Sequence, residues 1–284
     1  MPVAVVTDST AYLPVDLADA HAITVVPLVV VINGVEAREG VDVTPAAVAQ
    51  ALRERRGEVT TSRPSPEEFA TAYRHLLSAG ADGVVSVHLS GKLSGTHESA
   101  LMAASEVGDR VAVVDSGATG MGLGFPALCA ARAAAGGADL AATRAAATAA
   151  VGRTTTLFYV DTLEYLRRGG RIGAASAIVG TALSVKPILR MTEGAVAVRD
   201  KVRTASRALA RIVELAVEAA GQSDVDIAVH HVAARERAGD LMNTLVDRLG
   251  TRVRDRYVLE AGAAVAAHVG PGFAGIVVHN RSAE

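Results

Sequence analysis

Short apolar runs alternate with helix-like segments through the first half of the chain. The runs that predict strands are Val3–Val6, Ile23–Ile32, Val111–Val114 and the run that starts at Val84. Helical patterns separate them: Pro45–Arg55, with Thr44 as its cap, and a segment from Pro66 to Ser78 that follows the capping box Ser65–Glu68. Strands that alternate with helices favour a parallel sheet. We therefore expect an N-terminal parallel-sheet α/β domain over residues 1–156.

The second half of the chain has a different pattern. Lys186–Arg190 and Ala195–Arg199 flank Glu193-Gly194, which is typical of an antiparallel hairpin. The other expected elements are a strand at Thr156–Val160, a helix capped by Asp161, a small-residue helix at Ala174–Val185, an amphipathic helix at Ala205–Ala220, strands at Val225–His231 and Arg256–Glu260, and a last strand after Gly272. This half predicts a C-terminal mixed-sheet α/β domain over residues 157–284.

Polar residues follow several of the expected strands. The stretch from Val84 to Ala100 runs from a strand through a Ser/Gly loop into a helix that starts near Gly95. The first amides of a helix lack internal partners and its dipole is positive there, so this junction, with Ser94, predicts an anion site. Asp8 and Ser116 also follow expected strands, and the carboxyl ends of parallel strands share one crevice. Turn and capping chemistry is the alternative interpretation of Asp8.

Two further segments carry candidate ligand-binding side chains. Thr60, Thr61 and Ser62 precede Pro64 and Pro66 and are expected in a stiff extended loop, either as ligand-binding hydroxyls or as a solvated linker. His268 precedes a Gly-Pro-Gly turn that would hold it in place. A lone histidine can contact a ligand or be structural, and spacing does not decide between these roles.

Three arginines surround the end of the helix that Asp161 is expected to cap. Arg167, Arg168 and Arg171 lie on both sides of Gly169-Gly170, which should end that helix. Arginines at a helix C-terminus compensate its dipole, and they can also bind the phosphate or carboxylate of a partner.

Composition narrows the function classes. The net charge is −2, aromatic residues make up 3% of the chain and tryptophan is absent, which disfavours nucleic-acid binding. The single cysteine, Cys129, cannot form a disulfide within the chain, so a reducing cytoplasmic setting is expected. No signal-type N-terminus or membrane-length apolar window is evident, so we expect no membrane insertion.

Motif spacing argues against several catalytic classes. The sequence around Ser94 is G-x-x-S-G, whereas a nucleophile elbow needs G-x-S-x-G. Lys92 is followed by leucine, so no P-loop forms, and no metal-ligand cluster is apparent. An esterase that uses Ser94, His268 and Asp115 stays open as an alternative. A crevice of neutral hydroxyls suits carboxylate binding better than catalysis, so we expect a carrier without a cofactor or metal.

Seven ordered blocks of the chain resemble the DegV family of bacterial fatty-acid-binding proteins. They are TDSTAYLP at Thr7–Pro14, TTSRPSPEEF at Thr60–Phe69, LSGKLSGTHESA at Leu89–Ala100, VVDS at Val113–Ser116, DTLEYLRRGGRIG at Asp161–Gly173, KPIL at Lys186–Leu189 and HVGPGFAGI at His268–Ile276. The resemblance spans residues 3–281 approximately and implies a two-domain α/β protein with a long-chain fatty acid, such as palmitate, between the domains.

The resemblance also implies roles for individual residues. It places the fatty-acid carboxylate on Thr61 and Ser94, with the Gly95 amide and His268 nearby. It further implies a fatty-acid kinase as partner, to which the protein would present the carboxylate, with Arg167, Arg168 and Arg171 as docking residues. The remaining crevice residues that we expect near the ligand are Asp8, Ser62 and Ser116.

Overall fold

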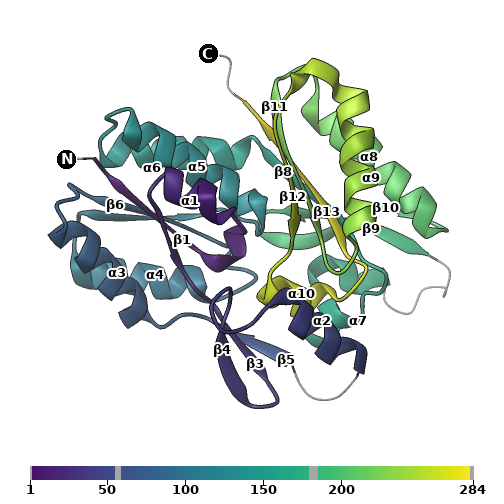
Figure 1. Ribbon diagram of the computed structural model, residues 1–284, viewed down its shortest axis with the longest axis horizontal. Helices are drawn as coiled ribbons and strands as arrows, with labels where there is room; N and C mark the ends of the chain where they lie inside the picture. The colour runs from purple at the N-terminus through teal and green to yellow at the C-terminus, as the bar shows by residue number, and fades with distance from the viewer. Residues whose placement is uncertain (1, 55–58, 179–184, 282–284) are drawn as a thin grey trace.

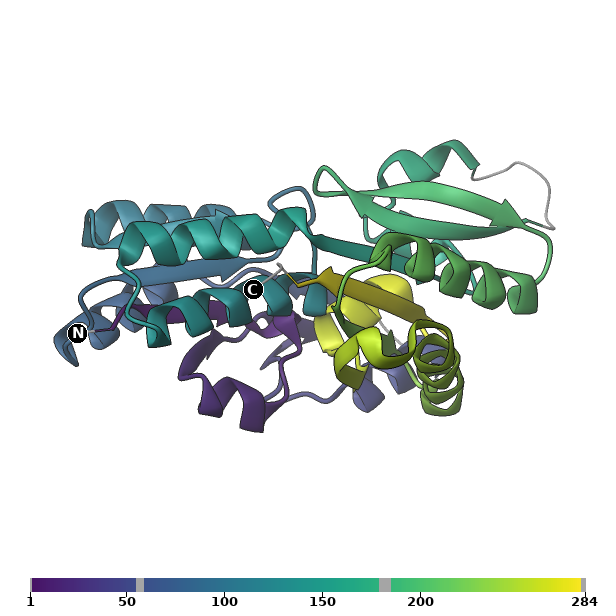
Figure 2. The ribbon, with the colours of Figure 1, turned by 90° about the horizontal axis from the view of Figure 1, so that it is seen from above.

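The structure is a computed structural model that describes residues 2–54, 59–178 and 185–281. Its elements build one parallel sheet, one larger mixed sheet and a small antiparallel sheet (Figures 1 and 2). The fold is thus the expected α/β arrangement, with a parallel sheet in the N-terminal part and a mixed sheet in the C-terminal part.

The N-terminal part is a parallel sheet between two helical layers. Its strand order is β2 (Ile23–Val26), β1 (Ala4–Asp8), β6 (Val84–His88), β7 (Val111–Asp115). Alternating side chains point to opposite faces, so Val6 packs with helices α3 (Pro66–Ser78) and α4 (Thr96–Val107), while Val5 packs with α5 (Met121–Ala135) and α6 (Leu140–Gly152). The short helix α1 (Val15–Ala20) precedes β2. The carboxyl ends of β1, β6 and β7 therefore meet at one edge.

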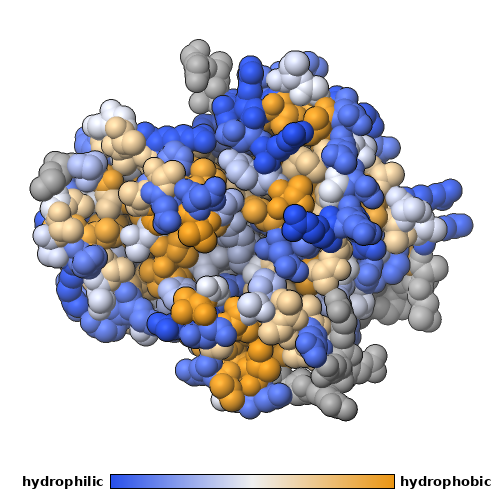
Figure 3. All heavy atoms as spheres, viewed as in Figure 1, coloured by the Kyte–Doolittle hydropathy of each residue, from blue (hydrophilic) through white to orange (hydrophobic). Residues whose placement is uncertain are grey.

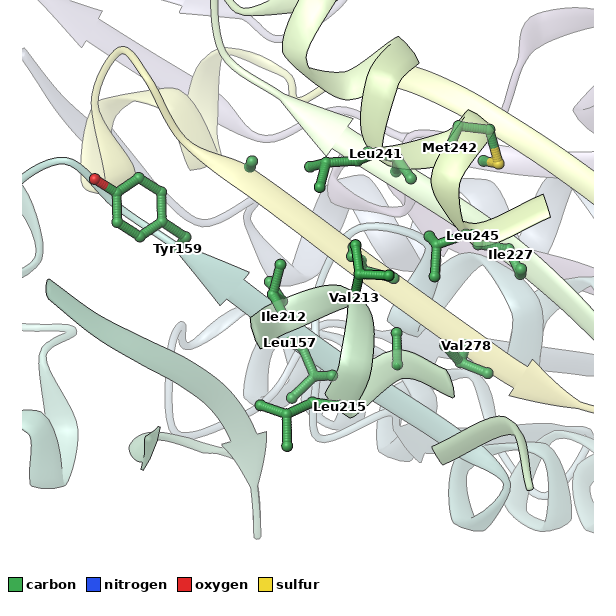
Figure 4. Packing of buried hydrophobic residues seen from close by; sticks show 14 of the residues in the cluster. Leu157, Tyr159, Ile212, Val213, Leu215, Ile227, Leu241, Met242, Leu245 and Val278 are labelled. Carbon is green, nitrogen blue, oxygen red and sulfur yellow. The ribbon is translucent and has the colours of Figure 1, made fainter. Parts of the chain in front are cut away.

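The C-terminal part is a six-stranded sheet with α8 (Ala205–Ala220) and α9 (Arg235–Leu249) on one face and α5 against part of the other. The strand order is β10 (Ala195–Val202), β9 (Lys186–Thr192), β8 (Thr154–Tyr159), β13 (Ala274–Asn280), β11 (Val225–His231), β12 (Val253–Glu260), and only β11 and β12 pair in parallel. Helices α8 and α9 cover one face, where they pack on side chains such as Leu157, Ile227 and Val278 (Figure 4). The intervening side chains of the same strands face the other way.

A small antiparallel sheet lies at the bottom of Figure 1, with the order β4 (Val35–Arg38), β3 (Val29–Ile32), β5 (Val59–Ser62). The buried hydrophobic residues of this sheet pack with those of α2 (Pro45–Glu54), α7 (Glu164–Arg168) and α10 (Ala263–Val269). Helix α10 carries His268. Val35 and Val41 are exposed on this lobe, where Figure 3 shows apolar side chains gathered. Within the described residues, short 3-10 turns also lie at Ser9–Ala11, Gly173–Ile178 and Gly250–Arg252.

Two segments near the N-terminus differ from expectation. Ile23–Ile32 is not one strand, because it divides at Pro27 into β2 of the parallel sheet and β3 of the small sheet. Proline has no N–H to donate to a sheet, so it marks the change of partner. Thr60–Ser62 is not a loop but part of β5, whose backbone pairs with β3.

Three details in the later part of the chain also differ from expectation. Helix α7 begins at Glu164 with Leu163 as its cap, and Asp161 instead accepts a hydrogen bond of 2.9 Å from the Tyr159 hydroxyl. The expected helix at 174–185 is a 3-10 turn up to Ile178, and residues 179–184 lie outside the described residues. The division at residue 156 stays a prediction, although β8, which contains that residue, belongs to the larger sheet.

Candidate functional site

A mostly apolar cavity lies where the N-terminal loops meet the face of the larger sheet that α8 and α9 do not cover. It opens to solvent, and the empty space in the cavity and its opening together amounts to about 900 Å³. Its apolar lining comes from both parts of the chain and includes Leu28, Leu89, Phe158, Leu166, Phe273 and Val277. Phe158 and Val277 lie on the face of the larger sheet opposite to the face that α8 and α9 cover. Aliphatic and aromatic walls of this kind suit an apolar ligand.

Three of the predicted carboxylate-binding residues line this cavity. Thr61 comes from β5, Ser94 from the loop before α4, and His268 from α10. The Thr61 Oγ1 atom lies 3.0 Å from His268 Nε2. Ser94 Oγ lies 2.9 Å from Thr96 Oγ1 and accepts a hydrogen bond of 3.3 Å from the Thr96 amide. Hydroxyls from two separate segments of the chain thus reach one cavity.

His268 is neutral in this environment. Burial, with a smaller effect of the nearby Arg171 guanidinium, lowers the pKa of His268 to about 4. Arg171 also lines the cavity, and its Nε donates a hydrogen bond of 2.9 Å to the Leu93 carbonyl while its Nη1 donates one of 2.5 Å to the Gly169 carbonyl. The site therefore combines a neutral imidazole with an inward-facing cation.

Gly95 caps α4 next to Ser94 but does not itself line the cavity. Arg63 covers it: the Arg63 Nη1 donates a hydrogen bond of 3.3 Å to the Gly95 carbonyl and pairs with Glu98 at 2.5 Å. A Cβ atom at position 95 would overlap the Arg63 side chain, so only glycine lets this arginine lie across the loop.

Three other predicted residues lie away from this cavity. Asp8 is fully buried below the loop, and Ser62 is exposed on β5, where its hydroxyl donates a hydrogen bond of 3.5 Å to the Arg63 carbonyl. Ser116 and Lys92 line a second, more polar cavity. This second cavity shares Thr156 and Met191 with the first one. The structure therefore does not gather these residues around the Thr61 and Ser94 hydroxyls.

The three arginines near Gly169 separate into two groups. Arg167 and Arg168 are exposed and pair with Glu164 at 3.0 and 3.6 Å. Arg171 instead points inward to the cavity, as its two carbonyl contacts show. Only the first two present their charge on the surface.

The alternative of a serine esterase finds no support in this geometry. His268 Nε2 contacts Thr61, and Ser94 Oγ contacts Thr96. A Ser-His-Asp chain does exist elsewhere, with Ser86 Oγ 2.6 Å from His88 Nε2 and His88 Nδ1 3.0 Å from Asp8. All three side chains are 0% exposed, so no ester can reach Ser86.

The cavity also contains polar side chains that the sequence did not indicate. Tyr12 and His230 both line it, and His230 Nε2 accepts a hydrogen bond of 2.9 Å from the Met121 amide. Buried Glu39 lies behind Tyr12, whose hydroxyl donates to it at 3.3 Å. Tyr12 belongs to the TDSTAYLP block, which could have drawn attention to it, whereas His230 lies within an ordinary strand pattern.

Neither a metal site nor a membrane span is found among the described residues. No three His, Cys, Asp or Glu side chains in residues 2–54, 59–178 and 185–281 come together as a metal site. None of the helices in this part of the chain combines the length and apolar character that a membrane span requires.

Known proteins resemble this chain over almost its whole length. The model of a family described as "Uncharacterised protein, DegV family" matches residues 2–281. A DegV domain-containing protein of Streptomyces coelicolor is 53% identical over 280 residues, which cover 98% of this chain and 99% of that protein.

Solved structures give the same assignment. A structure described as fatty acid binding of a DegV family protein from Thermus thermophilus has a TM-score of 0.93 and 37% identity, with 99% of this chain and 100% of that chain covered. The structure of DegV from Bacillus subtilis, described as a fatty acid binding protein, has a TM-score of 0.89 and 33% identity with the same coverage. By sequence and by fold, this chain therefore belongs to the DegV family.

Proposed function

We propose that this protein binds a long-chain fatty acid such as palmitate, with the alkyl chain in the apolar cavity and the carboxylate at Thr61 and Ser94. The observation that carries the proposal is the meeting of hydroxyls from separate segments at one apolar cavity. His268 completes the head-group site, and the Gly95 amide would act from beside Ser94 at the start of α4. The solved relatives that are described as fatty acid binding support the same ligand class.

The two parts of the ligand would contribute differently to binding. Burial of one methylene is worth roughly 0.8 kcal/mol, so an alkyl chain of about fifteen carbons contributes on the order of 10 kcal/mol before ordering costs. Hydrogen bonds from the hydroxyls to a carboxylate are charge-assisted and geometrically specific. The alkyl chain therefore supplies most of the affinity, and the hydroxyls fix where the head group lies.

In the cell, the protein would act in the cytoplasm as a carrier that presents the carboxylate to a fatty-acid kinase. The exposed Arg167 and Arg168 are candidates for docking that partner, since their charges face solvent. Arg171 would act from inside the cavity, where its charge favours an anionic head group. The carrier itself needs no cofactor or metal for this role.

The proposal is tested with the double variant Thr61→Ala and Ser94→Ala. Loss of two charge-assisted hydrogen bonds should weaken palmitate binding by roughly tenfold to a hundredfold while the fold is retained. The measurement is a titration with palmitate, together with mass spectrometry of the lipid that co-purifies.

A matched control changes the same residue types at exposed positions, Thr60→Ala beside Thr61 on β5 with Ser105→Ala on α4. This variant should bind palmitate as tightly as the unaltered protein. Equal binding by the Thr61/Ser94 variant and its control would contradict the proposal.

A second measurement concerns catalysis. A carrier should neither hydrolyse nitrophenyl palmitate nor form an adduct with a serine-directed phosphonate. Turnover that disappears in Ser94→Ala would instead identify an acyl hydrolase.

A further inference from the structure

Gly169 and Gly170 are both glycine, but for different reasons. Gly170 has a φ of +71°, which favours glycine whatever its surroundings, and no atom would contact an added Cβ there within 4 Å. Gly169 has ordinary helical angles, φ −74° and ψ −7°, that any residue can adopt. A Cβ atom at position 169 would, however, overlap the Nδ1 atom of His268. Space for the imidazole ring is therefore what requires glycine at this position.

The same contact restricts where His268 can carry its proton. Its Nδ1 atom is buried, faces Gly169 and has no hydrogen-bond partner in the described part of the chain. Its Nε2 atom has a partner, the Thr61 hydroxyl oxygen at 3.0 Å. A buried N–H without an acceptor is rarer in proteins than an under-satisfied acceptor. The proton is thus better placed on Nε2, where Thr61 Oγ1 can accept it.

We propose that Gly169 is a positioning residue that holds His268 as the Nε2–H tautomer, so that the ring donates to Thr61 and the Thr61 hydroxyl donates to the bound head group. This inference rests on the proposed fatty-acid function and deepens it, because it fixes the direction of each hydrogen bond. A ring that is neutral at ordinary pH agrees with it, since a doubly protonated ring would also direct an N–H at Gly169.

The direction of these bonds defines the class of head group. Thr61 has one hydroxyl proton, and when its oxygen accepts from His268 that proton is available to the ligand. A carboxylate only accepts hydrogen bonds, so it matches this donor, whereas an alkylammonium group only donates and leaves the Thr61 hydroxyl proton without an acceptor. We therefore expect palmitate to bind at least tenfold more tightly than hexadecylamine.

The tautomer is measured directly by NMR of isotope-labelled histidine side chains in the palmitate-loaded protein, with His268 assigned through His268→Gln. The expected result is a protonated Nε2 and an unprotonated Nδ1. A protonated Nδ1, alone or together with Nε2, would overturn the inference.

The role of Gly169 is tested with Gly169→Ala. The added methyl group should displace the ring, change the His268 nitrogen signals and weaken palmitate binding at least tenfold. The matched control is Gly239→Ala, because Gly239 lies in α9 with a negative φ and with no atom within 4 Å of an added Cβ. This control should leave both the signals and the affinity unchanged.

The outcomes separate the two proposals. Loss of affinity in Thr61→Ala with Ser94→Ala, but none in Gly169→Ala, would overturn the positioning role alone. A protein that binds no fatty acid at all would overturn the proposed function itself. If Gly169→Ala does not fold, the nitrogen signals of the unaltered protein still decide the tautomer.

Discussion

At the residue scale, Asp8 shows how a buried carboxylate supports the candidate site without contacting a ligand. One of its oxygens accepts hydrogen bonds from the Thr10 amide and hydroxyl at 3.0 and 2.6 Å, and the other accepts from the Leu89 amide at 2.9 Å. His88 Nδ1 lies 3.0 Å from the same second oxygen. Thr10 and Leu89 both line the cavity, so Asp8 fixes two of its walls from below.

Asp8→Asn should therefore destabilise the fold. Asparagine has nearly the same shape, but its NH₂ group would face N–H or O–H donors where a carboxylate oxygen now accepts them. We expect the free energy of unfolding to fall by about 3 kcal/mol, as measured by chemical denaturation. The exposed Asp247→Asn serves as control and should change it little. Equal stability of the two variants would refute this structural role for Asp8.

Sequence patterns locate some residues of the site and not others. Thr61, Ser94 and His268 are predicted as ligand contacts because hydroxyls and a histidine occur beside rigid turns in family-like blocks, and the structure brings all three to the cavity. Asp8 follows a strand in the same way, but its side chain turns inward. Tertiary packing sets that direction, and for the same reason sequence patterns miss His230, which reaches the cavity from an ordinary strand.

At the scale of elements, Glu39 ties the small sheet to α10. Its carboxylate accepts hydrogen bonds from the Ser9 hydroxyl at 2.5 Å and from the Ala264 amide at 2.7 Å, in the first turn of α10. The Tyr12 hydroxyl, which donates to Glu39, also accepts from the Val265 amide at 3.2 Å. These contacts connect the N-terminal loops to the helix that carries His268.

Glu39→Gln should loosen the start of α10. An amide offers one accepting oxygen where two now receive three donors, so at least one hydrogen bond is lost. We expect the Ala264 and Val265 amides to exchange with solvent roughly tenfold faster or more, as measured by hydrogen exchange. Glu36→Gln, which changes an exposed side chain on β4, is the matched control. Unaltered exchange at Ala264 would show that α10 does not depend on Glu39.

The boundaries of elements are predictable where local chemistry marks them. The capping box at Ser65 fixes the start of α3, and Glu193-Gly194 marks the hairpin turn. The division of Ile23–Ile32 between two sheets is not predictable from periodicity, because apolar strands on both sides of Pro27 look alike in sequence. The partner of each strand is decided by the rest of the fold.

At the scale of the whole molecule, several buried histidines make stability depend on pH. Burial, as the largest cause, lowers the pKa of His230, His268 and His279 to about 4 in the folded protein, from an ordinary value of 6.5. The pKa values of His21, His97 and His231 are lowered in the same direction, again mainly by burial. Between about pH 4 and pH 6.5, the unfolded chain therefore binds protons at these histidines that the folded chain does not bind.

Stability should therefore fall as the pH drops from about 6.5 toward 4, and it should be fully present above that window. Each such histidine contributes a slope of up to roughly 1.4 kcal/mol per pH unit, because unfolding takes up one proton at each. Glu39 acts in the opposite sense, since burial raises the pKa of its carboxyl group and acidification relieves that cost. Six histidines have a lowered pKa, whereas the Glu39 carboxyl group has a raised one, so the balance favours acid unfolding.

His279→Gln separates this effect from ligand binding, because His279 contacts Thr154 and Cys129 and does not line the cavity. Urea denaturation at a series of pH values gives the slope of the free energy of unfolding against pH, which reports how many protons unfolding takes up. In His279→Gln this uptake should be smaller than in the unaltered protein by up to one proton. The exposed His75→Gln should leave the slope as it is. Identical slopes in all three proteins would mean that His279 takes up no proton on unfolding. A smaller slope with unchanged palmitate binding would show that acid sensitivity belongs to the fold and not to the head-group site.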